Sequence, residues 1–318
     1  MDELDVKILR ALIAERAVSP SYSSVMLSLR GIAARLGADD MTIRYRYKKL
    51  QEAGVMSVWS LLVNPAFFGY GVTEVMVDVQ PESAKPDMIR KLKLVNEITG
   101  IVNFYGRAIS FYVMYMGDES GSRTIELISR VTNAERITRL RMPMPPSLTK
   151  DLTATDASII RSLSKDARKP TLLVAKELHL STKTVRKRVD RLRRGNTIMP
   201  LPILNIASIP GLIPVYLSYV YTRNEVKTSV DRDILLHFDA GYIMGSFSDP
   251  NVGNVVIGAL TMSEVPKILE WAKSQPGIAT ARVDIATETF MFPEKLIELL
   301  SLKQQEEAVA APQENAPL

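Results

Sequence analysis

The densest cluster of chemically active side chains in this chain of 318 residues is a run of cations at positions 178–198, LHLSTKTVRKRVDRLRRGNTI. Val185, Val189 and Leu192 recur in it at spacings of four and three residues, which is typical of a helix with one narrow apolar stripe. The other positions are mostly basic, and Asp190 is the single acid. Lysine and arginine neutralise phosphates and release counterions, so this helix is a candidate for binding a polyanion.

The segments before this helix decide between a solvated surface helix and a nucleic-acid reader. Asp156–Leu163 and Thr171–Leu178 are short and amphipathic, and a tight turn at Leu180 follows them. The hydroxyl of Ser181 can cap the basic helix. Two short helices, a turn and a basic third helix form the helix-turn-helix pattern. The β-prone run Thr197–Asn205 lies where a winged version would place its hairpin.

The same pattern occurs a second time near the start of the chain. Residues 32–56 resemble residues 174–198, and Arg44 and Arg186 are separated by 186 − 44 = 142 positions. A repeat of this length duplicates whole domains rather than a solenoid unit. The first copy holds about nine extra residues within positions 17–30. Further matched pairs are Asp5 with Asp156, Ile8 with Ile159, Ile43 with Val185, Arg46 with Arg188 and Leu50 with Leu192.

The two predicted third helices differ in charge. The helix Met41–Glu52 is less basic than its counterpart, and Asp39 or Asp40 caps it where a phosphate would otherwise be held. We therefore expect the first copy to bind nucleic acid more weakly. The residues predicted to contact DNA are Thr42, Arg44, Tyr45, Arg46, Lys48 and Lys49 in the first copy, and Ser181, Thr182, Lys183, Thr184, Arg186, Lys187, Arg188, Arg191 and Arg194 in the second.

Each helix-turn-helix is followed by alternating strand and helix patterns in the order β-α-β-β-α-β. This order predicts a ferredoxin-like domain, so the fold class is α+β with two winged helix-turn-helix domains, each followed by such a domain. Ile109–Met116 and Val255–Met262 are apolar on both faces, which implies that the face without helices is also covered. We expect the two α/β domains to pack sheet to sheet within one chain, as a covalent pseudo-dimer. Packing against an additional helix is the alternative.

The sequence divides into six segments. A first winged helix-turn-helix is expected at 1–64 and a first ferredoxin-like domain at 65–144, followed by a proline-rich linker at 145–152. A second winged helix-turn-helix is expected at 153–206 and a second ferredoxin-like domain at 207–292. The last segment, 293–318, is expected to be a helix followed by a disordered tail that begins at Lys303.

The bulk composition is that of a globular protein, with 46% hydrophobic and 24% charged residues and a net charge of +5. The absence of cysteine excludes disulfides and thiolate chemistry. No apolar run reaches the length of a membrane span, and the start of the chain lacks a signal-peptide pattern, so a cytoplasmic location is expected. No cofactor and no metal site is predicted, because no His, Asp and Glu cluster has ligand spacing.

The combination resembles the Lrp/AsnC family of transcription regulators. Leu4–Leu12, Ile32–Met56 and Leu62–Gly71 carry the resemblance in the first copy, and Thr155–Leu163 with Val174–Asn205 carry it in the second. The resemblance implies a DNA-binding regulator whose ferredoxin-like domain dimerises and often binds an amino acid. Ordinary members have one such unit, whereas this chain has two.

The resemblance also points to an effector loop between the middle strands. The family pattern places an acidic residue after a glycine there, but Arg107 follows Gly106, and in the second copy Asp249 stands one place late after Gly245 and Ser246. An amino-acid effector at these five residues is therefore left open, as is a further homo-oligomer.

We expect double-stranded DNA as the partner, with one chain covering two unlike half-sites roughly 34 Å apart. No membrane partner is expected. One alternative is an enzyme resembling the sirohaem decarboxylases, which would need a proton donor such as His179 or His237. Another is a ligand sensor that binds DNA weakly and acts with a partner.

Overall fold

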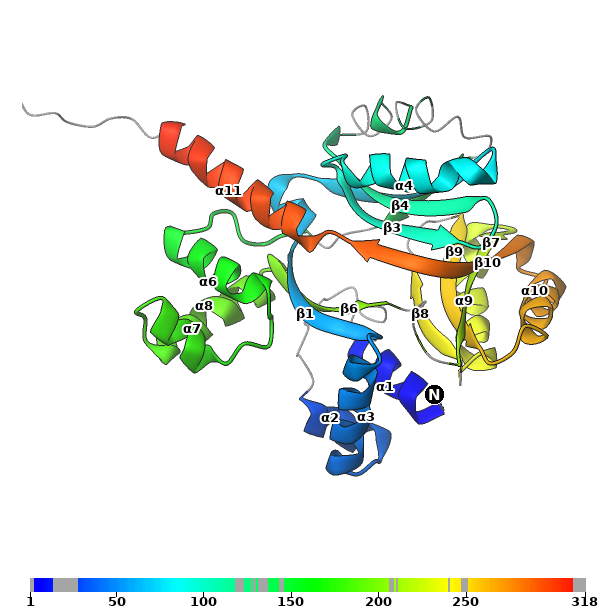
Figure 1. Cartoon of the computed structure of the whole chain (residues 1–318), viewed down its shortest axis with the longest axis horizontal. Coiled ribbons are helices and arrows are strands. Elements are labelled where there is room, and N and C mark those ends of the chain that lie inside the picture. Colours follow the sequence, from blue (N-terminus) through cyan, green and yellow to red (C-terminus); the bar gives the residue numbers. More distant parts are fainter. Residues whose placement is uncertain are drawn as a thin grey trace, which may run out of the picture.

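The computed structural model describes residues 3–13, 28–117, 123–126, 128, 130, 137–142, 146–205, 209, 211–239, 241–246 and 251–310. Within them, two units of three helices lie on one side of the molecule and the large β-sheet lies on the other (Figure 1). A slender two-stranded ribbon connects the helical units. The predicted α+β class is confirmed.

The first helical unit contains α1 (Glu3–Ile13), α2 (Leu29–Leu36) and α3 (Asp40–Glu52). Ser28 caps α2 by accepting a hydrogen bond from the backbone of Gly31, and Gly37 ends this helix in the left-handed conformation at φ 62°. Asp39 caps α3 by accepting from the backbone N–H of Thr42 at 3.0 Å. Asp39 is therefore the residue, of the two aspartates considered, that starts the third helix.

The second helical unit contains α6 (Ala154–Ser164), α7 (Thr171–Glu177) and α8 (Thr182–Arg194). Thr153 and Asp156 form a reciprocal capping box at the start of α6. Ser181 caps α8 by accepting from the backbone N–H of Thr184 at 3.0 Å. Asn196, at φ 53°, takes the left-handed conformation after α8, and Gly195 does not.

The strands that follow the two helical units pair with each other. β1 (Met56–Val63) and β6 (Ile198–Leu204) form an antiparallel ribbon, with Val63 opposite Ile198. The prediction that these runs form a separate wing in each copy is wrong. These mostly buried, mostly apolar runs satisfy their backbone groups across the two copies instead of in local hairpins. At the ribbon ends, Asn64 and Asn205 donate backbone hydrogen bonds to Thr197 and Val55.

The remaining strands form one eight-stranded sheet in the order β5-β2-β4-β3-β10-β7-β9-β8. Their bounds are β2 (Gly71–Asp78), β3 (Ile98–Phe104), β4 (Ala108–Tyr115), β5 (Ile137–Met142), β7 (Ile213–Tyr221), β8 (Tyr242–Ser246), β9 (Val252–Ala259) and β10 (Ile278–Met291). The helix α4 (Lys85–Lys93) covers the first half of the sheet, and α9 (Lys227–His237) and α10 (Glu264–Ser274) cover the second half (Figure 1).

The long strand β10 joins the two halves. Its first part pairs with β7 and its last part pairs with β3, with Ala286 opposite Phe104. The prediction that the two α/β domains pack face to face through their sheets describes only part of this arrangement. The inner faces do meet, because the rings of Phe104 and Tyr216 lie 5.0 Å apart, but the halves are also joined edge to edge by backbone hydrogen bonds.

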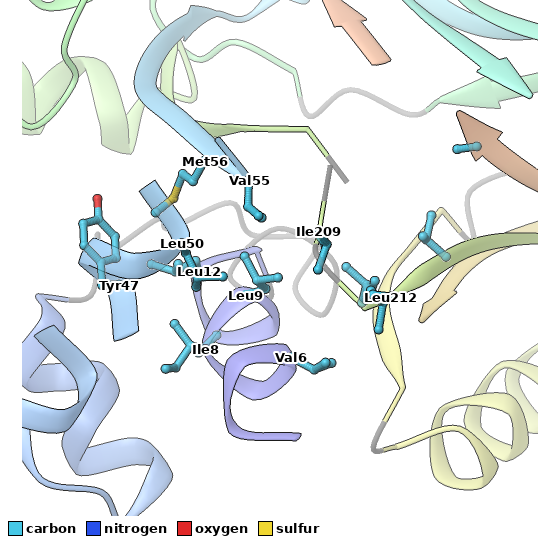
Figure 2. Packing of buried hydrophobic residues seen from close by; sticks show 14 of the residues in the cluster. Val6, Ile8, Leu9, Leu12, Tyr47, Leu50, Val55, Met56, Ile209 and Leu212 are labelled. Carbon is cyan, nitrogen blue, oxygen red and sulfur yellow. The ribbon is translucent and has the colours of Figure 1, made fainter. Parts of the chain in front are cut away.

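The first helical unit rests on the second half of the sheet. Figure 2 shows Val6 and Leu9 of α1 pointing toward Ile209 and Leu212, while the opposite side of α1 packs against α3. Arg10 of α1 also pairs with Asp239. In the other direction, Val72 and Met114 of the first half belong to the apolar cluster of the second helical unit. The first helical unit is therefore packed directly on the half-sheet of the opposite copy, whereas α6 of the second unit packs against β1 and α11.

The chain closes with α11 (Pro293–Ala310), which crosses from the sheet to the second helical unit (Figure 1). Leu296 and Leu300 are buried against α6 and the ribbon. The ammonium of Lys295 donates to the backbone oxygens of Lys93, Val95 and Ile98 at 3.2, 2.6 and 2.9 Å, respectively. Disorder from residue 303 is contradicted, since the helix continues to Ala310, and residues 311–318 lie outside the described part.

No helix among the described residues has both the length and the apolar character that crossing a membrane requires.

Candidate nucleic-acid interface

The helix α8 is held by a small apolar core and turns its charge outward. Val185 and Leu192 are buried, and Val189 is half-buried, as the stripe predicts. The helix carries seven basic residues and one acidic residue, which is 7 − 1 = +6 within 13 residues. A surface of this charge attracts phosphates and favours fast, salt-dependent association with nucleic acid.

Two of the predicted DNA-binding arginines hold the helical unit together. Arg188 pairs with Asp156 at 3.0 Å and Arg191 pairs with the other oxygen of the same carboxylate at 2.5 Å. Burial alone would raise the pKa of Asp156, but hydrogen bonds from Thr153 and the charges of both arginines outweigh it and hold this pKa below its ordinary value. These cations therefore fix α8 to the start of α6.

The other predicted residues of α8 face solvent. Thr182, Lys183, Arg186, Lys187 and Arg194 are exposed. Together with their neighbours on the helix they line an open groove of about 1040 Å³. Ser181 and Thr184 are occupied in the cap, where their hydroxyl oxygens lie 2.8 Å apart.

The corresponding face of α3 is less charged. Ile43, Tyr47 and Leu50 are buried, and the helix carries 4 − 2 = +2. The predicted contacts Thr42, Arg44, Tyr45, Lys48 and Lys49 are exposed. Lys48 lies 3.5 Å from Glu52, and Arg44 lies 2.9 Å from Asp40. The expected difference in charge between the two copies is therefore present on the surface.

Arg46 repeats the role of Arg188. It pairs with Asp5 at 3.0 Å, so each third helix is tied to the start of the first helix of its own unit by an arginine at the matching position, to which the second unit adds Arg191. The sequence contained this signal, because the repeat matches Asp5 with Asp156 and Arg46 with Arg188. From the sequence alone, an arginine that pairs with an aspartate cannot be distinguished from one that contacts a phosphate.

Sequence reasoning assigned no role to Met41, although its side chain is 73% exposed on α3 next to Tyr45, which is 67% exposed. The signal was an apolar residue on the polar side of an amphipathic helix.

The described residues among those predicted to bind an effector lie in a turn or a strand, where their backbone groups form hydrogen bonds within the protein. Gly106 forms the turn between β3 and β4 at φ 75°, and the buried ammonium of Lys85 donates to its carbonyl oxygen and to that of Phe104. The carbonyl oxygen of Arg107 accepts from Val79 at 2.9 Å. Gly245 and Ser246 pair with β9, and Asp249 lies outside the described residues. An effector role for these residues remains a prediction.

Comparison with known proteins places this geometry in a class of helix-turn-helix proteins. An AsnC-type helix-turn-helix domain model matches residues 152–193. An uncharacterized HTH-type transcriptional regulator of Pyrococcus furiosus is 34% identical over 99 residues, which is 31% of this chain and 60% of the relative. The HTH-type transcriptional regulator Ptr1 of Methanocaldococcus jannaschii is 28% identical over 106 residues, 33% of this chain and 66% of the relative. Neither match reaches two thirds of the relative's length.

The match identifies an AsnC-type helix-turn-helix domain in residues 152–193, in agreement with the resemblance to the Lrp/AsnC family. The architecture of the chain over its whole length is similar to that of the siroheme decarboxylase NirDL, at a TM-score of 0.55 and 14% identity, covering 97% of this chain and 99% of that one. At this identity the likeness concerns the fold alone.

Proposed function

We propose that the protein is a sequence-specific regulator of transcription of the AsnC type, which acts in the cytoplasm and binds double-stranded DNA with α3 and α8. The observation that carries this proposal is the exposed cationic face of α8, at +6 over 13 residues, on the third helix of a helix-turn-helix. Third helices of such units enter the major groove.

The units that carry α3 and α8 are connected by strands that both copies share, which favours binding of one DNA molecule by both helices of one chain. The ribbon of β1 and β6 takes one strand from each copy, and the two halves of the sheet share β10. One chain therefore has the arrangement of a dimer of single-unit proteins. Because α3 and α8 differ in charge and sequence, we infer two unlike half-sites, roughly one helical turn (about 34 Å) apart.

Selection of bound sequences from random double-stranded DNA tests the proposal directly. The expected outcome is two different motifs at a fixed spacing. In a salt titration with the selected DNA, the double variant Arg186→Ala with Lys187→Ala should bind more weakly. The negative slope of log affinity against log salt should become shallower by about 1 to 2. Lys267→Ala with Lys273→Ala, which removes the same charge from the exposed side of α10, is the control. Equal binding by both double variants would refute the assignment.

The enzymatic alternative lacks support in the described residues. The chain has two histidines, and both are exposed on the outside of different units. His179 lies in the turn before α8, and the ring of His237 stacks on Trp271 at 4.2 Å on the helical side of the second half-sheet. Incubation with sirohaem tests this alternative, since release of carbon dioxide would favour it. A ligand sensor with weak DNA affinity would instead yield no motif in the selection.

A further inference from the structure

Equivalent positions of the two third helices carry different chemistry. Across the repeat interval of 142 residues, Met41 corresponds to Lys183 and Tyr45 corresponds to Lys187. All four side chains are exposed, and they occupy the first two turns of their helices. In a helix-turn-helix this part of the third helix contacts the base edges. The second copy thus presents two cations where the first copy presents a thioether and a phenol ring.

The cations of the first two turns of α3 are already paired. Arg44 lies 2.9 Å from Asp40, and Arg46 lies 3.0 Å from Asp5. In α8 the residue at the position of Asp40 is Thr182, so Arg186 has no acidic neighbour one turn earlier. The side chains left for base contacts in these turns are therefore mainly apolar on α3 and mainly cationic on α8.

Met41 and Tyr45 are one turn apart, so their side chains are neighbours on the helix surface. They are 73% and 67% exposed, which leaves a large apolar area in water. The apolar feature of the DNA major groove is the C5 methyl group of thymine, and methionine and aromatic side chains can bury it. Guanine offers two acceptors instead, which suit the cations of α8.

We propose that α3 reads thymine methyl groups through Met41 and Tyr45, while α8 reads guanine. This inference rests on the proposed function and extends it to the base composition of each half-site. The exposed Lys49, later on the same helix, supplies a phosphate contact that holds the apolar pair in the groove.

The experiment starts from the selected DNA, in which the half-site of α8 is identified as the one whose preference changes with Arg186→Ala and Lys187→Ala. Thymines in the other half-site are then replaced one at a time by deoxyuridine, which lacks only the methyl group. For a methyl group buried by Met41 or Tyr45, affinity should fall about fourfold, the effect of removing one buried apolar carbon. Replacement in the half-site of α8 should change affinity less than twofold.

Variants assign the effect to the two side chains. In Met41→Ala with Tyr45→Ala, the penalty for deoxyuridine should disappear, whereas Tyr45→Phe, which keeps the ring, should retain it. Both residues are exposed, so the variants leave the core intact. Binding to a defined pair of half-sites without any deoxyuridine penalty, or with a penalty that the double variant keeps, would overturn the inference and leave the proposed function standing. A change in self-association in place of base preference would also overturn it. Failure to bind DNA would reject both.

Discussion

The indole Nε1 of Trp59 donates a hydrogen bond of 2.9 Å to the hydroxyl of Tyr47, which joins the ribbon strand β1 to α3. From the second helical unit, the guanidinium of Arg168 lies 4.0 Å from the centre of the Trp59 ring. The backbone N–H of Ala167 donates to the carbonyl oxygen of Trp59 at 2.7 Å. The loop that contains Ala167 and Arg168 therefore connects the second helical unit to Trp59 of β1, which is bonded to α3 of the first unit.

The first prediction concerns this hydrogen bond. Tyr47→Phe leaves the buried indole N–H without its partner, so the free energy of unfolding should fall by about 1–2 kcal/mol. Urea unfolding followed by tryptophan emission in a Trp271→Phe background makes Trp59 the reporter. Tyr45→Phe, which alters an exposed ring two residues away on the same helix, should leave the midpoint unchanged, and an equal midpoint for both variants would contradict the prediction.

The second prediction concerns Arg168. Arg168→Met keeps most of the unbranched apolar stem of the side chain but removes the cation above Trp59, which should lower the free energy of unfolding by about 1 kcal/mol. The contact between the two units should also loosen, so that adding one base pair between the selected half-sites should cost the variant less affinity than it costs the natural protein. Binding across a series of spacers measures this, and identical spacer profiles would show that Arg168 does not couple the units.

The third prediction concerns the carboxylate that holds α8. The pKa of Asp156 is lowered in the folded protein, so its contribution to stability is present above the unfolded value of 3.8 and is lost as the pH falls through the folded value. Asp156→Asn should cost about 2 kcal/mol at pH 7, and this difference should shrink at pH 3 and below. Asp151→Asn, at an exposed position nearby, is the control, and a pH-independent difference would argue against the ion pairs as the cause.

The fourth prediction has the opposite sign. Burial raises the pKa of Glu74, which accepts a hydrogen bond from Ser110 inside the sheet. The folded state then binds its proton more tightly than the unfolded state, so stability should decline as the pH rises above the ordinary value of 4.5. Glu74→Gln should remove this decline and raise the free energy of unfolding at pH 7 by about 1 kcal/mol. Urea unfolding between pH 4 and pH 8 tests this, with Glu270→Gln on the surface as control.

Local patterns were sufficient to predict the helical units. The stripe of Val185, Val189 and Leu192 and the cap at Ser181 depend on spacing within about one turn, so the sequence contains the whole signal. The pairing of β1 with β6 depends on partners more than 130 residues apart, for example Val63 with Ile198. A run that fits a hairpin equally fits a ribbon between copies, and the sequence does not distinguish them.

The candidate site shows the same division. Local sequence patterns alone reveal two third helices, the greater basicity of α8, and the presence of Met41 and Tyr45 where α8 has lysines. Which cations are engaged within the protein depends on the tertiary structure. Arg46 and Arg188 are engaged with Asp5 and Asp156 because the first helix of each unit places a carboxylate beside them. Charge is a property of each residue, whereas its availability to a ligand depends on which neighbours the fold places within a few ångströms.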